Sequence, residues 1–269
     1  MASRAWLLFA GLGLLAAADL GPDLLTAARK GQTTGVRALL DKGAPLESRN
    51  KEGRTPLMLS AQHGHSDSVA LLLGRGADAG ARDNEGWTAY GLALFSQDAG
   101  RERILKALPP PRPWRLALEA VLAPGNLYSS CSMSPPQLAQ FIGGLHLDTL
   151  AADTVREAAI AGAGTEAPVA LVAAEPDAVA SLRVRPQVSC VQQDSSDNLS
   201  LAIDVRVTVK GSPEPLLDKT FGGGLKGLHA RRAASPVQYR GLFADWAKNH
   251  AGPIYWAVVA ALLKYRIPS

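Results

Sequence analysis

Two cysteines carry the most reactive side chains that the sequence offers. Cys131 and Cys190 are the only thiols in the chain. They could form a disulfide, as cysteine pairs in exported proteins do, and the closed loop would then add about 2–4 kcal/mol to stability. Alternatively, one thiol is buried on a strand and the other lies in a loop beyond its reach. No histidine neighbours either cysteine in the sequence, so we expect no catalytic thiol.

The histidines show no spacing typical of a metal site. His63 and His65 lie two residues apart, and the others are isolated at His146, His229 and His250. No pair has the H-x-x-x-H spacing with which one helix binds zinc. The sequence also lacks the serine-nucleophile and zinc-protease motifs. We therefore expect no catalytic residue, no metal and no cofactor.

The glycine-rich segment 221–227, FGGGLKG, invites comparison with a phosphate-binding loop. It lacks the Gly-Lys-Ser/Thr ending of such a loop, so we expect an ordinary loop without a nucleotide. It lies in a stretch between Asp218 and Asp245 that contains no acidic residue. Basic residues of this stretch could contact an anionic membrane weakly or could simply be solvated. They are Lys226, Arg231, Arg232 and Arg240.

Charge and composition narrow the classes of function. The formal net charge is +4, with 28 basic and 24 acidic residues spread evenly along the chain. This pattern is not that of a nucleic-acid-binding protein, so we expect no nucleic-acid partner. The hydrophobic fraction of 47% in 269 residues is enough for two domains of ordinary size.

The N-terminus has the pattern of a targeting segment. Arg4 supplies a positive charge, residues 6–15 are apolar, and three alanines at 16–18 precede Asp19. We expect a cleavable signal peptide over residues 1–18, cut between Ala18 and Asp19, and a mature protein that is periplasmic or secreted. The alternative is a retained anchor or a buried first helix.

The segment 51–83 is organised as one structural repeat. Gly53 opens a turn, and Thr55-Pro56 begins a helix, because Thr can cap a helix and Pro suits its first position. A second helix is expected from a cap at Ser66 to a stop at Gly76. Residue types recur 33 positions apart, as at Leu39 and Leu72, Gly43 and Gly76, and Thr55 and Thr88. A constant period of this length marks stacked pairs of helices.

With G-x-TPL, GH, LLL and GAD in place, residues 23–108 resemble about three ankyrin repeats with degraded ends. The family's TPLH motif is Thr55-Pro56-Leu57-Met58 here and TAYG at 88–91, so we expect a looser stack. The resemblance implies that the loop tips and inner helices bind a protein partner, with Trp87 projecting at a tip. The matching tip positions are Arg49, Asn50, Glu52, Arg54, Arg82, Asn84, Glu85 and Trp87.

A proline-rich linker at 109–113 leads to residues 114–269, for which no family resemblance is found. Strict alternation of apolar and polar residues at 182–190 and 199–209 predicts a β-hairpin, with Asp204 among arginines on its wet face. A short strand is expected at 169–174. Helices are expected at 114–123, from Pro135, at 153–161, from Pro236 with a break at Gly252-Pro253, and at 254–263.

The predicted fold is thus a mainly α ankyrin-like repeat stack followed by a small α+β domain with an antiparallel hairpin packed by helices. We expect an exported, non-enzymatic interaction scaffold of the bacterial envelope that binds a protein through its repeats. The alternative is an enzyme, or a ligand-binding or envelope-transport accessory activity, in the C-terminal domain, with the repeats as a docking accessory.

Overall fold

The chain divides into two compact units, Met1–Pro109 and Pro110–Ser269. The division falls inside the proline tract. The computed structural model describes residues 19–123, 135–162, 169–191, 196–230 and 236–265.

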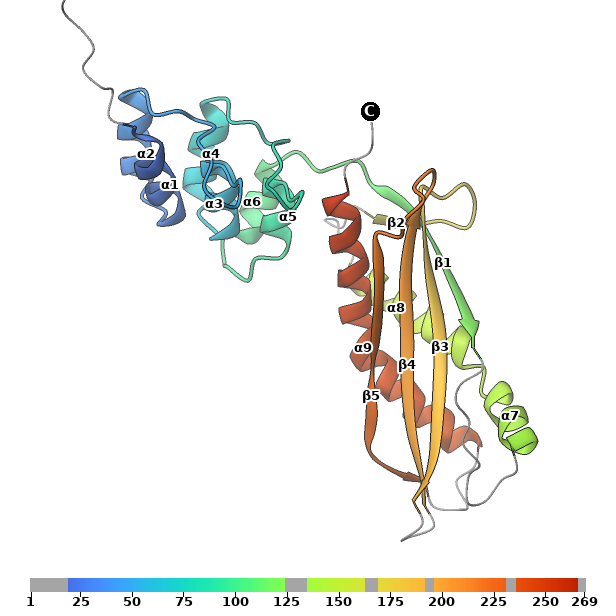
Figure 1. The fold of residues 1–269 in the computed structure, drawn as a ribbon. Coiled ribbons are helices and arrows are strands. Elements are labelled where there is room, and N and C mark those ends of the chain that lie inside the picture. The colour runs from blue at the N-terminus through green and yellow to red at the C-terminus, as the bar shows by residue number, and fades with distance from the viewer. Residues whose placement is uncertain (1–18, 124–134, 163–168, 192–195, 231–235, 266–269) are drawn as a thin grey trace, which may run out of the picture. The chain divides into compact units, whose positions relative to one another are not determined.

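The N-terminal unit consists of helix pairs that stack side by side (Figure 1). The pairs in the described residues are α1 (Gly21–Arg29) with α2 (Thr33–Asp41), α3 (Pro56–Gln62) with α4 (Ser66–Gly74), and α5 (Ala89–Leu94) with α6 (Arg101–Ala107). Helix α3 contacts both α1 and α5, whereas α4 contacts α2 and α6. The first helices of the pairs therefore form one layer and the second helices another, which confirms the predicted repeat stack.

Helices α3 and α5 begin at threonine caps, as predicted for Thr55, whereas α1 has Leu20 at its cap position and no side-chain cap. The Thr55 side-chain oxygen accepts a hydrogen bond from the backbone N–H of Met58 at 3.3 Å, and Thr88 accepts one from Gly91 at 3.3 Å. The prediction that Ser66 caps the next helix is wrong, because α4 has His65 at its cap position and no side-chain cap. The His65 ring instead bonds the carbonyl of Arg29 at 2.9 Å and so joins the first repeat to the second.

The same period places the core. Leu24 and Leu57, 33 residues apart, are both buried, and so are Ala28 and Ala61. The buried hydroxyl of Ser60 donates to the Ala28 carbonyl at 3.3 Å, which adds a polar tie between α3 and α1. Equivalent residues of neighbouring repeats thus pack on one another, so each repeat covers the apolar face of the next.

The C-terminal unit is a five-stranded sheet with helices on one face (Figure 1). Its strands are β1 (Trp114–Leu122), β2 (Val169–Leu171), β3 (Ala178–Val191), β4 (Ser196–Val209) and β5 (Leu217–Ala230), in the order β2-β1-β3-β4-β5. Helix α7 (Pro135–Gly144) precedes α8 (Leu147–Gly162), and α9 (Pro236–Lys264) ends the unit. Helix α8 contacts β1, β3 and α9, whereas α9 also contacts β4 and β5. The predicted α+β class is confirmed.

The predicted hairpin is also confirmed. Strands β3 and β4 pair antiparallel with Leu182 opposite Val205, both fully buried beneath the helices. On the opposite face, Arg185 donates two hydrogen bonds of 2.6 Å to the Asp204 carboxylate, which also accepts one from Thr220 at 2.7 Å. This is the cross-strand charge pairing expected of Asp204. The sheet as a whole is mixed, because β1 runs parallel to both β2 and β3.

The prediction of a helix at 114–123 is wrong, because this segment forms β1. Its leucines, alanines and glutamate favour a helix in isolation. However, Leu116 alternates with more exposed neighbours and is 2% exposed, and the strand bonds to a partner on each side. Pairing on two edges outweighs the local preference.

The glycine-rich segment 221–227 is not a loop but part of strand β5. Gly222 permits a close approach to β4. A Cβ atom on Gly222 would lie 2.7 Å from the carbonyl oxygen of Leu201 and 2.9 Å from the Cα of Ala202. The absence of a side chain at this position thus allows β5 to pair with β4. The pairing of these two strands also has a register irregularity between Asn198 and Ser200.

The predicted break at Gly252-Pro253 is absent, since α9 runs through Pro253. A proline inside a helix costs about 3 kcal/mol. The burial of Ala251, Ile254 and Tyr255 around it, each at 2% exposure or less, offsets this cost. Among the helices of the described residues, none has both the length and the apolar character needed to cross a bilayer.

Candidate protein-binding face

The tip residues implied by the resemblance lie on loops that bond to one another. Arg49 donates from Nη1 to the carbonyl of Gly53 and to that of Arg82, both at 2.8 Å. Arg82, one repeat further on, donates to the carbonyl of Gly86 at 2.6 Å. These two arginines therefore close their own loops, and Arg49 also ties its loop to the next.

Asn50 and Asp83 hold the turns at equivalent positions of the two loops. Oδ1 of Asn50 accepts from the backbone N–H of Arg54 at 2.8 Å. Oδ1 of Asp83 accepts from the N–H groups of Glu85 and Trp87 at 2.9 and 2.8 Å, while its Oδ2 is 3.2 Å from Nε of Arg54. The Asp83 side chain is 1% exposed. Sequence analysis missed Asp83, although its spacing of 33 from Asn50 indicated the shared role.

The second loop also rests on the first through Asn84. The backbone N–H of Asn84 donates to the Glu52 carbonyl at 3.0 Å, and its side-chain amide donates to the Lys51 carbonyl at 2.9 Å. Gly53, with a φ of +78°, lies directly beneath, so that a Cβ there would come within 2.3 Å of the Asn84 side-chain oxygen. The side chains of Glu52, Asn84 and Glu85 are exposed at the edge.

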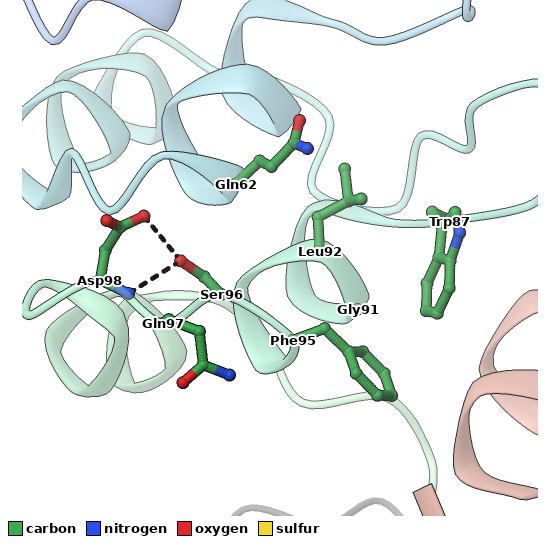
Figure 2. Close-up of a pocket in the computed structure, with 8 residues that line it drawn as sticks. All are labelled: Gln62, Trp87, Gly91, Leu92, Phe95, Ser96, Gln97 and Asp98. Carbon is green, nitrogen blue, oxygen red and sulfur yellow. Dashed lines mark hydrogen bonds between the residues drawn. The ribbon is translucent and has the colours of Figure 1, made fainter. Parts of the chain in front are cut away.

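Trp87 does not project into solvent but lies half-buried against α5, where it lines a hollow of about 260 Å³ (Figure 2). Its ring meets that of Phe95 edge to face, with centroids 5.4 Å apart. Phe95 is 37% exposed. The other lining residues are Gln62, Gly91, Leu92, Ser96, Gln97 and Asp98. We call this the aromatic hollow.

A second hollow of about 450 Å³ lies between α1, α3 and the first loop. Its apolar lining comes from Pro22, Leu25 and Leu59, and its polar lining from Thr26, Arg29, Arg49, Asn50 and Lys51. We call this the basic hollow. Leu59 of the basic hollow and Gln62 of the aromatic hollow are three residues apart on α3, so both hollows open on one face. This repeat face comprises α1, α3, α5 and the loops 49–54 and 82–87.

His63, at the C-terminal end of α3, has a shifted pKa. Burial, followed by the nearby His65, lowers the pKa of His63 below its ordinary value of 6.5, and Asp98 opposes this shift. The two imidazole rings have their centroids 6.2 Å apart. These surroundings therefore favour the neutral form of His63.

Several predicted positions lie outside the described residues: Ala18, Cys131, Arg231 and Arg232. Cys190 and Lys226 are placed only as positions in β3 and β5, so the disulfide and the membrane-contacting basic patch stay predictions. Arg240 is exposed in α9, and the Asp19 carboxylate accepts a hydrogen bond from Gly21 at 3.1 Å.

A small apolar cavity lies in the C-terminal unit. It lies between the sheet and α8 and α9, is lined by residues such as Leu182 and Tyr255, and has a volume of about 10 Å³, roughly that of one water. The Tyr255 hydroxyl finds no hydrogen-bond partner in the described part of the chain, and burial raises the pKa of Tyr255. Within the described residues, no group of three or more potential metal ligands gathers.

The stacked helix pairs, their threonine caps and their interlocked loops define a helical repeat module. The match to known families is consistent with this class: residues 24–109 match the family model of ankyrin repeats, in three copies. This segment thus consists of ankyrin repeats, whereas residues 110–269 have no family assignment. A search of curated proteins found no match to the chain.

Proposed function

We propose that the chain is an interaction scaffold whose repeat face binds a protein partner. Ankyrin repeats are generally protein-binding modules, and the observation that supports this face is the pair of hollows on it. Together they offer two arginines and two aromatic side chains, which are the types that carry most binding energy at protein interfaces.

The experiment is site-specific photo-crosslinking of the full chain in its native cells. A photoreactive amino acid replaces Gln62, which lines the aromatic hollow, or Arg29, which lines the basic hollow. Two exposed positions act as controls: Arg37 on α2, and Arg183 on the open face of the sheet. Arg54 and Arg82 are avoided because they hold the loops together.

The proposal predicts one crosslinked protein from both hollows and none from either control. Crosslinking from Arg183 alone would place the interaction on the C-terminal unit and contradict the proposal. A partner captured equally at all four positions, or at none, would equally speak against a specific repeat face.

We also infer that the chain is exported and cut after Ala18. The support is the order of a positive residue, an apolar run and small residues ahead of Asp19. In the envelope, the C-terminal unit would provide a second attachment for whatever the repeats bind. N-terminal sequencing of the mature protein tests the cleavage: a first residue of Asp19 supports it, and an uncut Met1 refutes it.

A further inference from the structure

Three cations line the basic hollow, and no carboxylate of the described residues does so. Arg29 comes from α1, while Arg49 and Lys51 come from the first loop. All three side chains are exposed. Beneath them, Leu25 and Leu59 form an apolar floor. The hollow therefore offers positive charge at its rim and an apolar surface at its centre.

The charge of these residues is not neutralised within the unit. Arg54 and Arg75, by contrast, pair with Asp83 and Asp41. Arg49 donates to two backbone carbonyls and to no carboxylate among the described residues. Arg29 and Lys51 form no side-chain hydrogen bond or ion pair in the described part of the chain.

The concentration of positive charge is local. Residues 19–109 contain twelve lysines and arginines against eleven aspartates and glutamates, so the unit as a whole is nearly neutral. Glu52 follows Lys51 at the loop tip, but it does not line the hollow. An anionic group that enters the hollow thus meets three cations and no acid among the lining residues, and electrostatic steering favours its approach.

The aromatic hollow has no basic residue among its lining residues and combines aromatic with polar side chains. Trp87, Leu92 and Phe95 provide apolar surface, and the acid on its border, Asp98, accepts a hydrogen bond from Ser96 at 2.8 Å (Figure 2). The repeat face is thus basic over the first two repeats and aromatic over the third. A ligand that fills both hollows must carry negative charge at one end and an apolar side chain at the other.

We propose that the occupant is a segment of the partner protein that places two or more carboxylates at the basic hollow and an apolar side chain in the aromatic hollow. This inference rests on the proposed function, and it adds the chemistry and the direction of the bound segment. A polyphosphate backbone or a lipid surface would use the cations of the rim but would leave the apolar floor and the aromatic hollow unfilled. A peptide satisfies all three features.

The test is a selection of binders from a displayed library of random peptides. The immobilised target is the chain from Asp19 to Ser269, which lacks the expected signal peptide. Peptides of about 16 residues suffice, since they extend over roughly 50 Å. We expect the recovered peptides to be enriched in Asp and Glu near one end and in Leu, Phe or Trp near the other, always in the same order.

Charge reversal then locates the bound peptides. Fluorescence anisotropy measures the affinity of the best peptide for Arg29→Glu/Lys51→Glu and for the control Arg37→Glu/Lys42→Glu, whose exposed side chains do not line either hollow. Both double variants change the net charge of the repeat unit by the same amount. We expect affinity to fall by about tenfold or more in the first variant and by less than twofold in the control.

Each other outcome overturns the inference. Recovered peptides that are neutral or basic but still bind the repeat face would leave the proposed function standing and refute the acidic partner. No enriched peptide, or equal loss in both double variants, would refute the inference as well. So would stronger binding of the wild-type protein to anionic phosphatidylglycerol vesicles than to any selected peptide, because a membrane would then be the occupant.

Discussion

The buried carboxylate of Asp83 allows a direct test of how the repeats are joined. It accepts two backbone hydrogen bonds in its own loop, from Glu85 and Trp87, and faces Arg54 of the preceding repeat at 3.2 Å. Replacing Asp83 with alanine removes all three interactions together. It also leaves a guanidinium that is only 20% exposed without its carboxylate, although Gln62 still accepts one hydrogen bond from it.

The cost can be worked from these contacts. A hydrogen bond to a charged group contributes about 1.5–3 kcal/mol, and bonds that share one carboxylate do not add fully. Removing one partner of a buried ion pair costs about 3–5 kcal/mol, and Arg54 is partly solvated. We therefore expect Asp83→Ala to destabilise the repeat unit by about 3 kcal/mol, which lowers its Tm by roughly 12–24 °C.

Asp83→Asn is the matched variant. It keeps an oxygen to accept from the loop, as Asn50 does one repeat earlier, where it accepts from the Arg54 N–H at 2.8 Å. It removes only the charge that faces the Arg54 guanidinium. We expect a loss of about 1 kcal/mol, so the difference between the two variants isolates the turn bonds from the ion pair.

Amide hydrogen exchange of the full chain, followed by mass spectrometry, measures the loss of stability in both Asp83 variants. Peptides from α3 and α5 should exchange faster in Asp83→Ala than in Asp83→Asn, and faster in both than in wild type. Peptides from β3 and β4, in the other unit, serve as the internal control. If α3 and α5 exchanged at the same rate in Asp83→Ala as in wild type, this carboxylate would not join the repeats.

Other residues yield shorter predictions. The pKa of His63 is lowered in the folded state, so the stability that neutral His63 contributes is present above pH 6.5 and is lost as the pH falls. The difference between the Tm values at pH 7.5 and pH 5.0 should therefore be smaller in His63→Gln than in wild type. The hydrogen bonds from Arg185, and to a smaller extent the one from Thr220, lower the pKa of Asp204. The wild-type protein should therefore lose this stabilisation below about pH 4. Denaturant titration at pH 7 should show that Asp204→Asn lowers the free energy of unfolding by about 1 kcal/mol. Gly222→Val should destabilise the sheet by about 1–3 kcal/mol because of its close contact with β4, whereas Gly241→Ala, in open space on α9, should not.

The sequence predicts the repeat unit well because each local signal there agrees with the next. Thr55 caps its helix, Pro56 fills the first position, and the period of 33 brings Leu24 and Leu57 together. Such a unit is built from short-range contacts, so local rules suffice. The hairpin of the second unit is predictable for the same reason, since β3 and β4 are adjacent in sequence and strictly alternating.

The misses depend on distant contacts. Strand β1 pairs with β2 and β3, which follow it by some fifty residues or more, so no local pattern decides between helix and strand. Gly222 belongs to a strand only because Leu201 and Ala202 lie against it. The site shows the same limit: the resemblance indicates the tip loops, but not that Arg54 faces Asp83, nor that Trp87 lines a hollow instead of projecting from it.

The most direct measurement of the central claim is the amide-exchange footprint of the bound partner, or of a selected peptide, on the full chain. Our account predicts slower exchange on binding in residues 22–29, 49–54, 59–62 and 87–95, with β1 to β5 unchanged. Protection confined to the strands or to α8 and α9, with the repeat face unaffected, would contradict it.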